Sequence, residues 1–205
     1  MAKEITKKMF LSIASVLLVI IVVVSIISIS GDKIQYNILA TDRVRLAPTY
    51  DDLGVVSDVI IKATVVPGKE NKTIEADNGT IVFGYTMTQL KISDVFKGNV
   101  VEGGIITITE EYYTLANNRK VIYTQGNYMP VQENGEYIFF LKSYDELSPY
   151  AGMFFPIDLE YGKYSVNLAN KIVSPESISA SELEIVSYDV KYVEFATKVV
   201  EDYLR

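Results

Sequence analysis

The chain has no histidine, no cysteine and no tryptophan among its 205 residues. Without His and Cys it can form neither a Ser-His-Asp triad nor a Cys-His pair, and it lacks the usual zinc ligands. The absence of cysteine also excludes disulfides and a lipid attached to an N-terminal cysteine. The sequence contains no P-loop or GxGxxG stretch, so it predicts no nucleotide site. We therefore expect no catalytic, cofactor-binding or metal-binding residues, and a protein that is not an enzyme.

One uncharged run stands out near the N-terminus. Residues 9–29 read MFLSIASVLLVIIVVVSIISI, and these 21 residues would form a helix of about 32 Å, enough to cross a hydrocarbon core of about 30 Å. Lys3, Lys7 and Lys8 precede the run and are accompanied by a single acid, Glu4. By the positive-inside rule, residues 1–8 are cytoplasmic. The sequence thus predicts a transmembrane helix at 9–29 that anchors the chain in the lipid bilayer, with its C-terminal part outside.

A cleaved secretory signal is the alternative interpretation of the same run. Ser28 and Ser30 are small residues placed for a cut before Gly31, which would release a secreted protein. The apolar run is longer than the roughly 7 to 15 residues of a usual signal core, which favours an uncleaved anchor. Both interpretations place the rest of the chain outside the cytoplasmic membrane.

The outer part is acidic. Without its first thirty residues the chain keeps 16 of its 19 Lys and Arg and 25 of its 26 Asp and Glu, a formal charge of −9. This charge argues against nucleic acid as a partner. An exported chain without cysteine is typical of Gram-positive bacteria, and its fold must be held by packing alone.

Turn signals and apolar alternation predict a tether at 30–48 and one domain at 49–205, mainly β with a C-terminal helix. Thr49 with Asp52, and Ser179 with Glu182, have capping-box spacing, which predicts a short first helix and a helix from about Ser179 to Leu204 that is broken near Ser187. The stretch 69–80 is polar, and Asn78–Gly79 within it is a strong turn signal. Strands are predicted at 59–65, 81–93, 105–113, 121–124, 137–144, 161–166 and 170–173.

Five segments follow one another along the chain: SDVIIKATV, MTQLKISDVFKGN, GGIITIT, MPVQENGEYIFFLKSY and YGKYSV. Their order resembles a group of exported or membrane-anchored Gram-positive bacterial proteins whose function is not established, and the OB-type barrel of netrin and metalloproteinase-inhibitor modules. The resemblance covers roughly residues 50 to 175 and implies a five- to six-stranded OB-like barrel. The inhibitors act through an N-terminal cysteine that binds the zinc of the target, and this chain has no cysteine, so that mechanism is not implied.

The C-terminal helix carries two apolar stripes when it is plotted at about 100° per residue. A helix lying on a barrel needs only one. Either neighbouring loops enclose the second stripe, or its aromatic side chains bind a partner. With two tyrosines at the end of a predicted strand, the candidate partner surface comprises Tyr188, Tyr192, Phe195, Val199, Tyr112 and Tyr113.

Tyrosine, with 15 residues, and paired carboxylates are the remaining chemical signals. Tyr144, Tyr150 and Phe154–Phe155 fall near strand ends and loops, where an OB barrel presents its ligand surface. Packing in a β protein without disulfides is the more usual role of such rings. We expect an interaction module that binds a protein or cell-envelope component. The alternatives are a carboxylate-pair hydrolase acting on envelope glycan and an accessory subunit of a membrane complex. The candidate carboxylate pairs are Asp51–Asp52, Glu110–Glu111, Asp145–Glu146 and Asp158 with Glu160.

Overall fold

A computed structural model describes residues 34–39, 45–172 and 178–205. The chain divides into two compact units, Met1–Gln35 and Tyr36–Arg205, and the second contains the described helices and strands apart from Gln35. Within the described ranges, no helix combines the length and the apolar character needed to cross a membrane. The run at 9–29 and the cleavage position near Ser30 lie outside the described residues.

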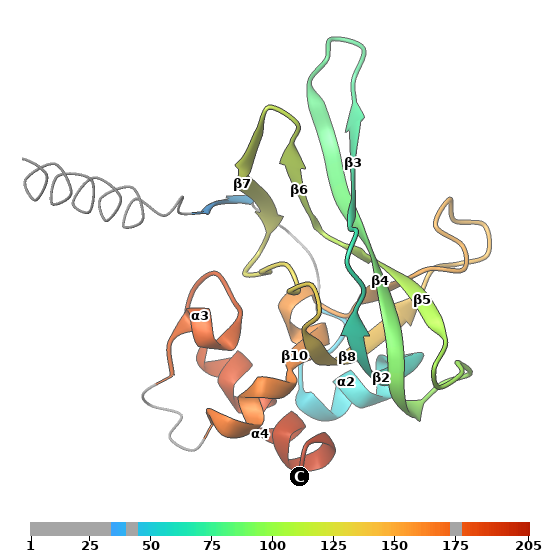
Figure 1. The fold of residues 1–205 in the computed structure, drawn as a ribbon, viewed down its shortest axis with the longest axis vertical. Helices are drawn as coiled ribbons and strands as arrows, with labels where there is room; N and C mark the ends of the chain where they lie inside the picture. The colour runs from blue at the N-terminus through green and yellow to red at the C-terminus, as the bar shows by residue number, and fades with distance from the viewer. Residues whose placement is uncertain (1–33, 40–44, 173–177) are drawn as a thin grey trace, which may run out of the picture. The chain divides into compact units, whose positions relative to one another are not determined.

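Five strands form a closed barrel (Figure 1). Hydrogen bonds link them in the order β8-β2-β4-β5-β9, and β9 pairs back with β8 to complete the ring. All neighbours are antiparallel except β5 and β9, which pair in parallel through Ile108 and Phe154. The expected fold, mainly β with a C-terminal helix, is therefore confirmed. The barrel strands are β2 (Val59–Val65), β4 (Ile81–Lys97), β5 (Ile105–Glu110), β8 (Glu136–Ser143) and β9 (Phe154–Pro156).

Side-chain alternation along β2 and β8 builds two cores. In β2 the odd residues from Val59 to Val65 face the barrel interior, where they meet Leu90, Ile92 and Ile108. Strand β8 is apolar on both faces, as a central strand should be, and it pairs with β2 on one edge and with β9 and β10 (Lys163–Ser165) on the other. Its inward residues are Tyr137, Phe139 and Leu141, and its outward residues are Ile138 and Phe140.

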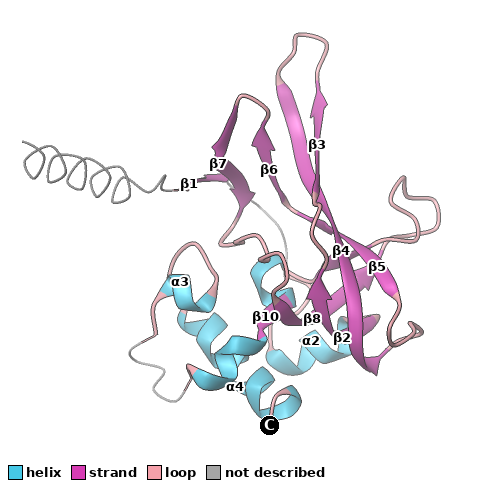
Figure 2. Cartoon of the chain, viewed as in Figure 1, coloured by secondary structure: helices cyan, strands magenta, loops and turns pink. Residues whose placement is uncertain are grey.

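The helices gather on one side of the barrel, as Figure 2 shows. They cover the outer face of β2 and β8, so that Ile60 and Phe140 join a second core with residues of α4. The helix α4 is the longest of them, and it buries six side chains there. The helical elements are α2 (Tyr50–Val56), the 3₁₀ turns η1 (Leu159–Gly162) and η2 (Val166–Asn170), α3 (Ala180–Leu183) and α4 (Val190–Tyr203).

Both predicted capping boxes are present. The Thr49 side chain accepts a hydrogen bond from the backbone N–H of Asp52, whose carboxylate accepts one in return, and Ser179 with Glu182 repeats the arrangement at α3. A break separates α3 from α4, and Asp189 caps the second helix. The break predicted near Ser187 is confirmed.

Two hairpins extend beyond the barrel and lie side by side in Figure 1. One joins β3 (Glu70–Glu75) to the first half of β4, and the other joins β6 (Tyr112–Leu115) to β7 (Asn118–Gln125). The side-chain amide of Asn71 links them, because its Oδ1 accepts from Thr114 N at 2.7 Å and its Nδ2 donates to Thr114 O at 3.0 Å. Strand β1 (Gln35–Leu39) pairs with β7 and falls in the segment predicted to be a tether.

The turn predicted at Asn78–Gly79 is confirmed, because these residues connect β3 to β4. The polar stretch before it contains a strand that was not predicted: β3 is an edge strand with one apolar residue, Ile74, so it shows no alternation that could identify it. The strand expected at 170–173 is absent from its described residues, 170–172, because η2 ends at Asn170 and a turn follows it. Leu168 and Ile172 are four residues apart and both join the core beneath the helices, which is a helical spacing.

Candidate functional site

The helix stripe that was a candidate partner surface is mostly enclosed. Tyr192, Phe195 and Val199 are 0%, 2% and 0% exposed, whereas Tyr188 is 49% exposed. The Tyr192 hydroxyl donates a hydrogen bond to the backbone oxygen of Lys163 at 2.9 Å. Three of the four residues of the predicted stripe are therefore core residues, and Tyr188, which precedes α4, is the one of the four that is open to a partner.

The two strand tyrosines of that candidate surface are also packed. Tyr113 stacks on Tyr123 with ring centroids 5.0 Å apart, and its ring covers Gly84 of β4. The Tyr112 hydroxyl accepts a hydrogen bond from Lys69 Nζ at 3.2 Å. Both side chains are buried, and together they hold the β6–β7 hairpin against β3 and β4.

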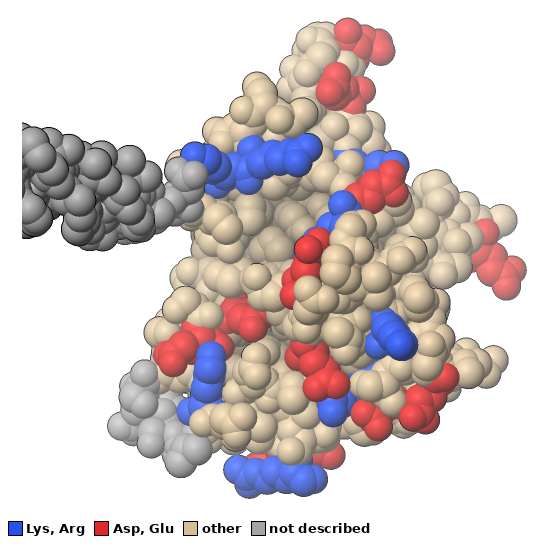
Figure 3. Space-filling model, in the orientation of Figure 1, with Lys and Arg blue, Asp and Glu red and all other residues tan. Residues whose placement is uncertain are grey.

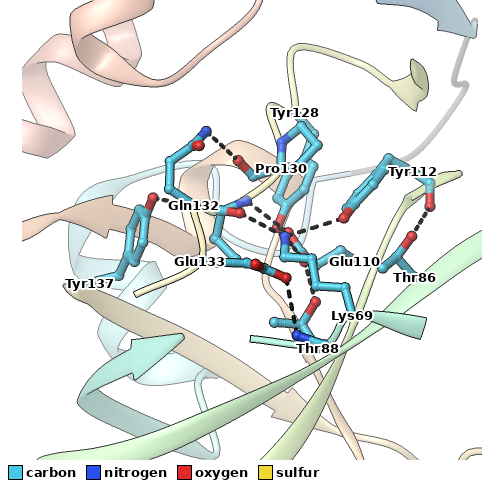
Figure 4. Close-up of polar contacts among 12 residues, drawn as sticks. Lys69, Thr86, Thr88, Glu110, Tyr112, Tyr128, Pro130, Gln132, Glu133 and Tyr137 are labelled. Atoms are coloured by element: carbon cyan, nitrogen blue, oxygen red, sulfur yellow. Dashed lines mark hydrogen bonds and ion pairs between the residues drawn. The ribbon is translucent and has the colours of Figure 1, made fainter. Parts of the chain in front are cut away.

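Glu110 lies at the centre of a buried polar network (Figure 4). Its side chain is fully buried and ion-paired with Lys69 Nζ at 2.9 Å. It also accepts hydrogen bonds from the Tyr128 hydroxyl at 2.8 Å, from Val131 N at 3.0 Å and from the Thr88 hydroxyl. Burial and the charge of Glu110 raise the pKa of Tyr128 well above its usual value, so Tyr128 remains a donor. This network joins β4, β5 and the loop before β8.

A second buried cation lies near this network. Lys163 is 1% exposed, and burial lowers its pKa to about 8. Its ammonium donates to the Glu184 backbone oxygen at 3.1 Å and lies 5.2 Å and 5.8 Å from the ring centroids of Tyr128 and Tyr137. The contacts of Lys163 are all with the protein interior, so we assign it to the core.

The remaining carboxylates of the predicted pairs take separate positions. Asp52 caps α2, and Asp158 accepts hydrogen bonds from the backbone N–H groups of Leu46 and Ala47. Glu160 is buried, which raises its pKa to about 7. In the part of the chain that the structure describes, no three carboxylates come together as a metal site would require. Asp51, Asp145 and Glu146 are exposed.

An aromatic pocket opens on the barrel face formed by β4 and β5. It encloses about 310 Å³, and its seven lining residues come from β4, from β5 and the residue after it, from the β8–β9 loop and from β9. All five of its rings are half-buried, so part of each is presented to solvent. We refer to this feature as the aromatic pocket, lined by Phe83, Tyr85, Thr109, Glu111, Tyr144, Tyr150 and Phe155.

The five rings follow one another in an unbroken series. Phe83 and Tyr85, two residues apart on one face of β4, have centroids 5.9 Å apart. Tyr85 meets Tyr150 edge to face at 5.1 Å, Tyr150 meets Tyr144 at 5.0 Å, and Tyr144 meets Phe155 at 4.8 Å. Successive rings are tilted by 79°, 47° and 50° from Tyr85 onward, so neighbouring rings of this wall are not parallel.

Polar groups fix part of this wall. The hydroxyls of Thr109 and Tyr144 lie 2.6 Å apart and share a hydrogen bond, which ties the β8–β9 loop to β5. Burial and the neighbouring Tyr85 raise the pKa of Tyr150, so its phenol is neutral at physiological pH. Glu111 supplies a carboxyl group to the pocket, and the described lining residues include no Lys or Arg.

Sequence reasoning found half of this site. Tyr144, Tyr150 and Phe155 were recognised as loop and strand-end aromatics near an OB-type ligand surface, but they were not included in the candidate surface. Phe83 and Tyr85 were missed. Their spacing of two residues on a predicted strand is the signal that places both rings on one face.

A larger depression of about 940 Å³ lies between the two hairpins. Its wall carries charges of both signs, Lys69 and Arg119 against Glu70 and Glu75, and Asn71 bridges its two sides. Its size comes from the separation of the hairpins, and it presents one ring, that of Tyr112, which is buried. The smaller aromatic pocket is therefore the stronger candidate for a binding site.

Neither a protein-family model nor a curated protein sequence matches the chain. The interpretation of its function therefore depends on the geometry of the pocket and on the barrel that carries it.

Proposed function

We propose that this protein is a membrane-anchored binding module, held outside the cytoplasmic membrane by residues 9–29, whose OB-type barrel recognises a protein or cell-envelope component. The observation that carries this proposal is the position of the aromatic pocket on the barrel. It occupies the face and the loop that OB-folds use for ligands.

The strand order supports the OB assignment. Numbered within the barrel, β2, β4, β5, β8 and β9 are strands one to five, and they close in the order 1-2-3-5-4 with the third and fifth strands parallel. OB-folds bind ligands on the face of strands two and three, flanked by the loops that follow strands one and four. In this barrel the second and third strands are β4 and β5, and the loop after the fourth contributes Tyr144 and Tyr150 to the pocket.

The charge distribution agrees with a ligand other than nucleic acid. The outer part of the chain has a formal charge of −9. On the face drawn in Figure 3, Lys and Arg are interspersed with Asp and Glu, apart from one band over the β6–β7 hairpin. The described lining of the aromatic pocket contains a carboxyl group and no Lys or Arg, which is unfavourable for a phosphate backbone.

Site-specific photo-cross-linking in intact cells tests the function. A photoreactive amino acid at Leu147, which is 96% exposed on the loop beside the pocket, should capture the partner. Capture should be lost when Tyr150→Leu removes one pocket ring and should persist with Tyr188→Leu, a matched change on the helix side. A photoreactive residue at Val55, which is 74% exposed on α2, provides the control for random capture. If capture from Leu147 is unchanged by Tyr150→Leu, the proposal is contradicted.

The anchor and the orientation are tested separately. Protease added to intact protoplasts should digest residues 31–205, whereas residues 1–8 should be protected. Fractionation before proteolysis should find the domain with the membrane if the anchor is uncleaved, and in the medium if cleavage occurs near Ser30. Protection of the domain would overturn the orientation.

A further inference from the structure

We propose that the aromatic pocket binds a quaternary ammonium group, a trimethylated organic cation carried by a component of the cell envelope. This inference rests on the proposed binding function and names the chemistry of its ligand. It depends on the arrangement of the rings, the charge of the lining residues and the size of the pocket.

The ring arrangement suits a rounded cation. The face of an aromatic ring carries partial negative charge, and a cation within about 6 Å of the ring centroid is attracted to it. Tyr85, Tyr150, Tyr144 and Phe155 turn by 79°, 47° and 50° from one ring to the next, so they cannot form a flat platform. Tilted rings around a pocket suit a tetrahedral ammonium group, which has no flat face, whereas a sugar ring stacks best on one flat face.

The electrostatics point to a positive charge. Among the described residues that line the pocket, Glu111 is the one Asp, Glu, Lys or Arg, and the four other polar side chains are hydroxyls of Thr and Tyr. On the adjoining strand, Lys72 pairs with Tyr85 across β3 and β4 and is ion-paired with Glu70. A ligand cation therefore enters a site with a carboxyl group and negative ring faces, inside a domain of formal charge −9.

The volume of the pocket and the hydration of the cation favour a quaternary ammonium group over a primary ammonium or a sugar. A volume of about 310 Å³ holds an ammonium head group with a few attached carbons, not an oligosaccharide. A primary ammonium such as that of lysine is compact and strongly hydrated, so half-buried rings compensate poorly for its lost water. A trimethylammonium group has apolar methyl groups that pack on the rings while its charge still interacts with them.

Calorimetric titration of the full-length protein in a polyoxyethylene detergent tests this proposal, because that detergent contains neither choline nor sugar. Choline should bind, and its neutral isostere 3,3-dimethyl-1-butanol should bind at least about tenfold more weakly, since it has the same shape without the charge. Nα-acetyl-lysine methylamide should also bind at least about tenfold more weakly. Equal binding of the isostere, or of the lysine derivative, would overturn the inference, as would binding of N-acetylglucosamine oligomers without choline.

Point variants test whether choline binds in the aromatic pocket. Tyr150→Leu should reduce choline affinity at least tenfold, Tyr150→Phe should retain it, and Glu111→Gln should reduce it several-fold. Tyr188→Leu should leave it unchanged, and melting temperatures check that each variant is folded. If choline fails to bind while photo-capture still depends on Tyr150, the ligand assignment falls and the binding function stands. If Tyr150→Leu alters neither choline binding nor photo-capture, both proposals are wrong.

Discussion

Lys69 and Glu110 form an ion pair with Nζ and Oε1 2.9 Å apart and with Glu110 fully buried. Lys69 lies just before β3, and Glu110 ends β5, so the pair connects the base of the β3–β4 hairpin to the barrel. A carboxylate removed from water is stable only while its charge and its lone pairs are compensated. Lys69 supplies that charge, and it also donates to Val131 O at 2.6 Å.

Removing this cation should be costly. Lys69→Met keeps the length of the side chain and leaves Glu110 buried without its counter-ion, so we expect a loss of about 3 to 5 kcal/mol in the free energy of unfolding. Chemical denaturation followed by circular dichroism measures it. Lys72→Met is the matched control, because the Lys72–Glu70 pair is exposed and its loss should leave the free energy of unfolding close to that of the wild type. Equal effects of the two substitutions would show that the buried network does not stabilise the fold.

The contact between Gly84 and Tyr113 makes a second prediction. A Cβ at position 84 would lie 2.3 Å from Cγ of Tyr113, so Gly84→Ala should force the hairpins apart and cost about 1 to 3 kcal/mol. Gly54, inside α2, has open space within 4 Å of the position that an added Cβ would occupy, and Gly54→Ala should stabilise the helix by up to about 1 kcal/mol. In thermal unfolding we therefore expect the melting temperature to fall with Gly84→Ala and to rise with Gly54→Ala. If Gly84→Ala does not lower the stability, the β6–β7 hairpin is not packed on β4.

Glu160 should make stability depend on pH. Burial raises its pKa to about 7, the charge of Asp189 acts in the same direction, and its Oε2 has no hydrogen-bond partner among the described residues. The folded state thus binds this proton more tightly than the unfolded state, whose Glu has its ordinary pKa of about 4.5. The contribution to stability is complete below about pH 4.5 and is lost as the pH rises to about 7.

The test compares the wild type with Glu160→Gln, which keeps the neutral shape. The variant should gain stability relative to the wild type between about pH 4.5 and pH 8, by up to about 3 kcal/mol, in chemical denaturation at several pH values. Taking the difference between the two proteins cancels the titration of the other carboxylates. A difference that is constant with pH would show that Glu160 is already ionised in the folded protein.

The sequence predicted the elements whose signals are local. The pairs Thr49–Asp52 and Ser179–Glu182 encode their caps within four residues, and the alternation of Val59 to Val65 encodes a strand with one buried face. Strand β3 was not predictable in this way, because an edge strand exposed on both faces has no alternation, and its pairing with β4 is what makes it a strand.

The pocket shows the same limit at longer range. Phe83 and Tyr85 lie more than fifty residues from Tyr144, Tyr150 and Phe155, and only the closed barrel brings the two groups together. Conversely, the apolar side chains of α4 gave a correct helix but could not show what covers each stripe. Three tyrosine rings cover the aromatic stripe of α4: Tyr164 of β10 lies against Tyr192, and Tyr161 of η1 and Tyr50 of α2 lie against Phe195.

The burial of Phe195 leads to a prediction that separates the core side of α4 from the exposed residue Tyr188 that precedes this helix. Its ring meets those of Tyr50 and Tyr161 at 5.9 Å and 5.3 Å, so Phe195→Ala should leave a cavity and cost about 3 to 5 kcal/mol. Tyr188→Ala should change the free energy of unfolding by no more than about 0.5 kcal/mol, since that ring is 49% exposed. Denaturant titrations of both variants, combined with photo-capture from Leu147, test whether the helix has any binding role. Loss of capture with Tyr188→Ala at full stability would place a partner on the helix end as well as on the aromatic pocket.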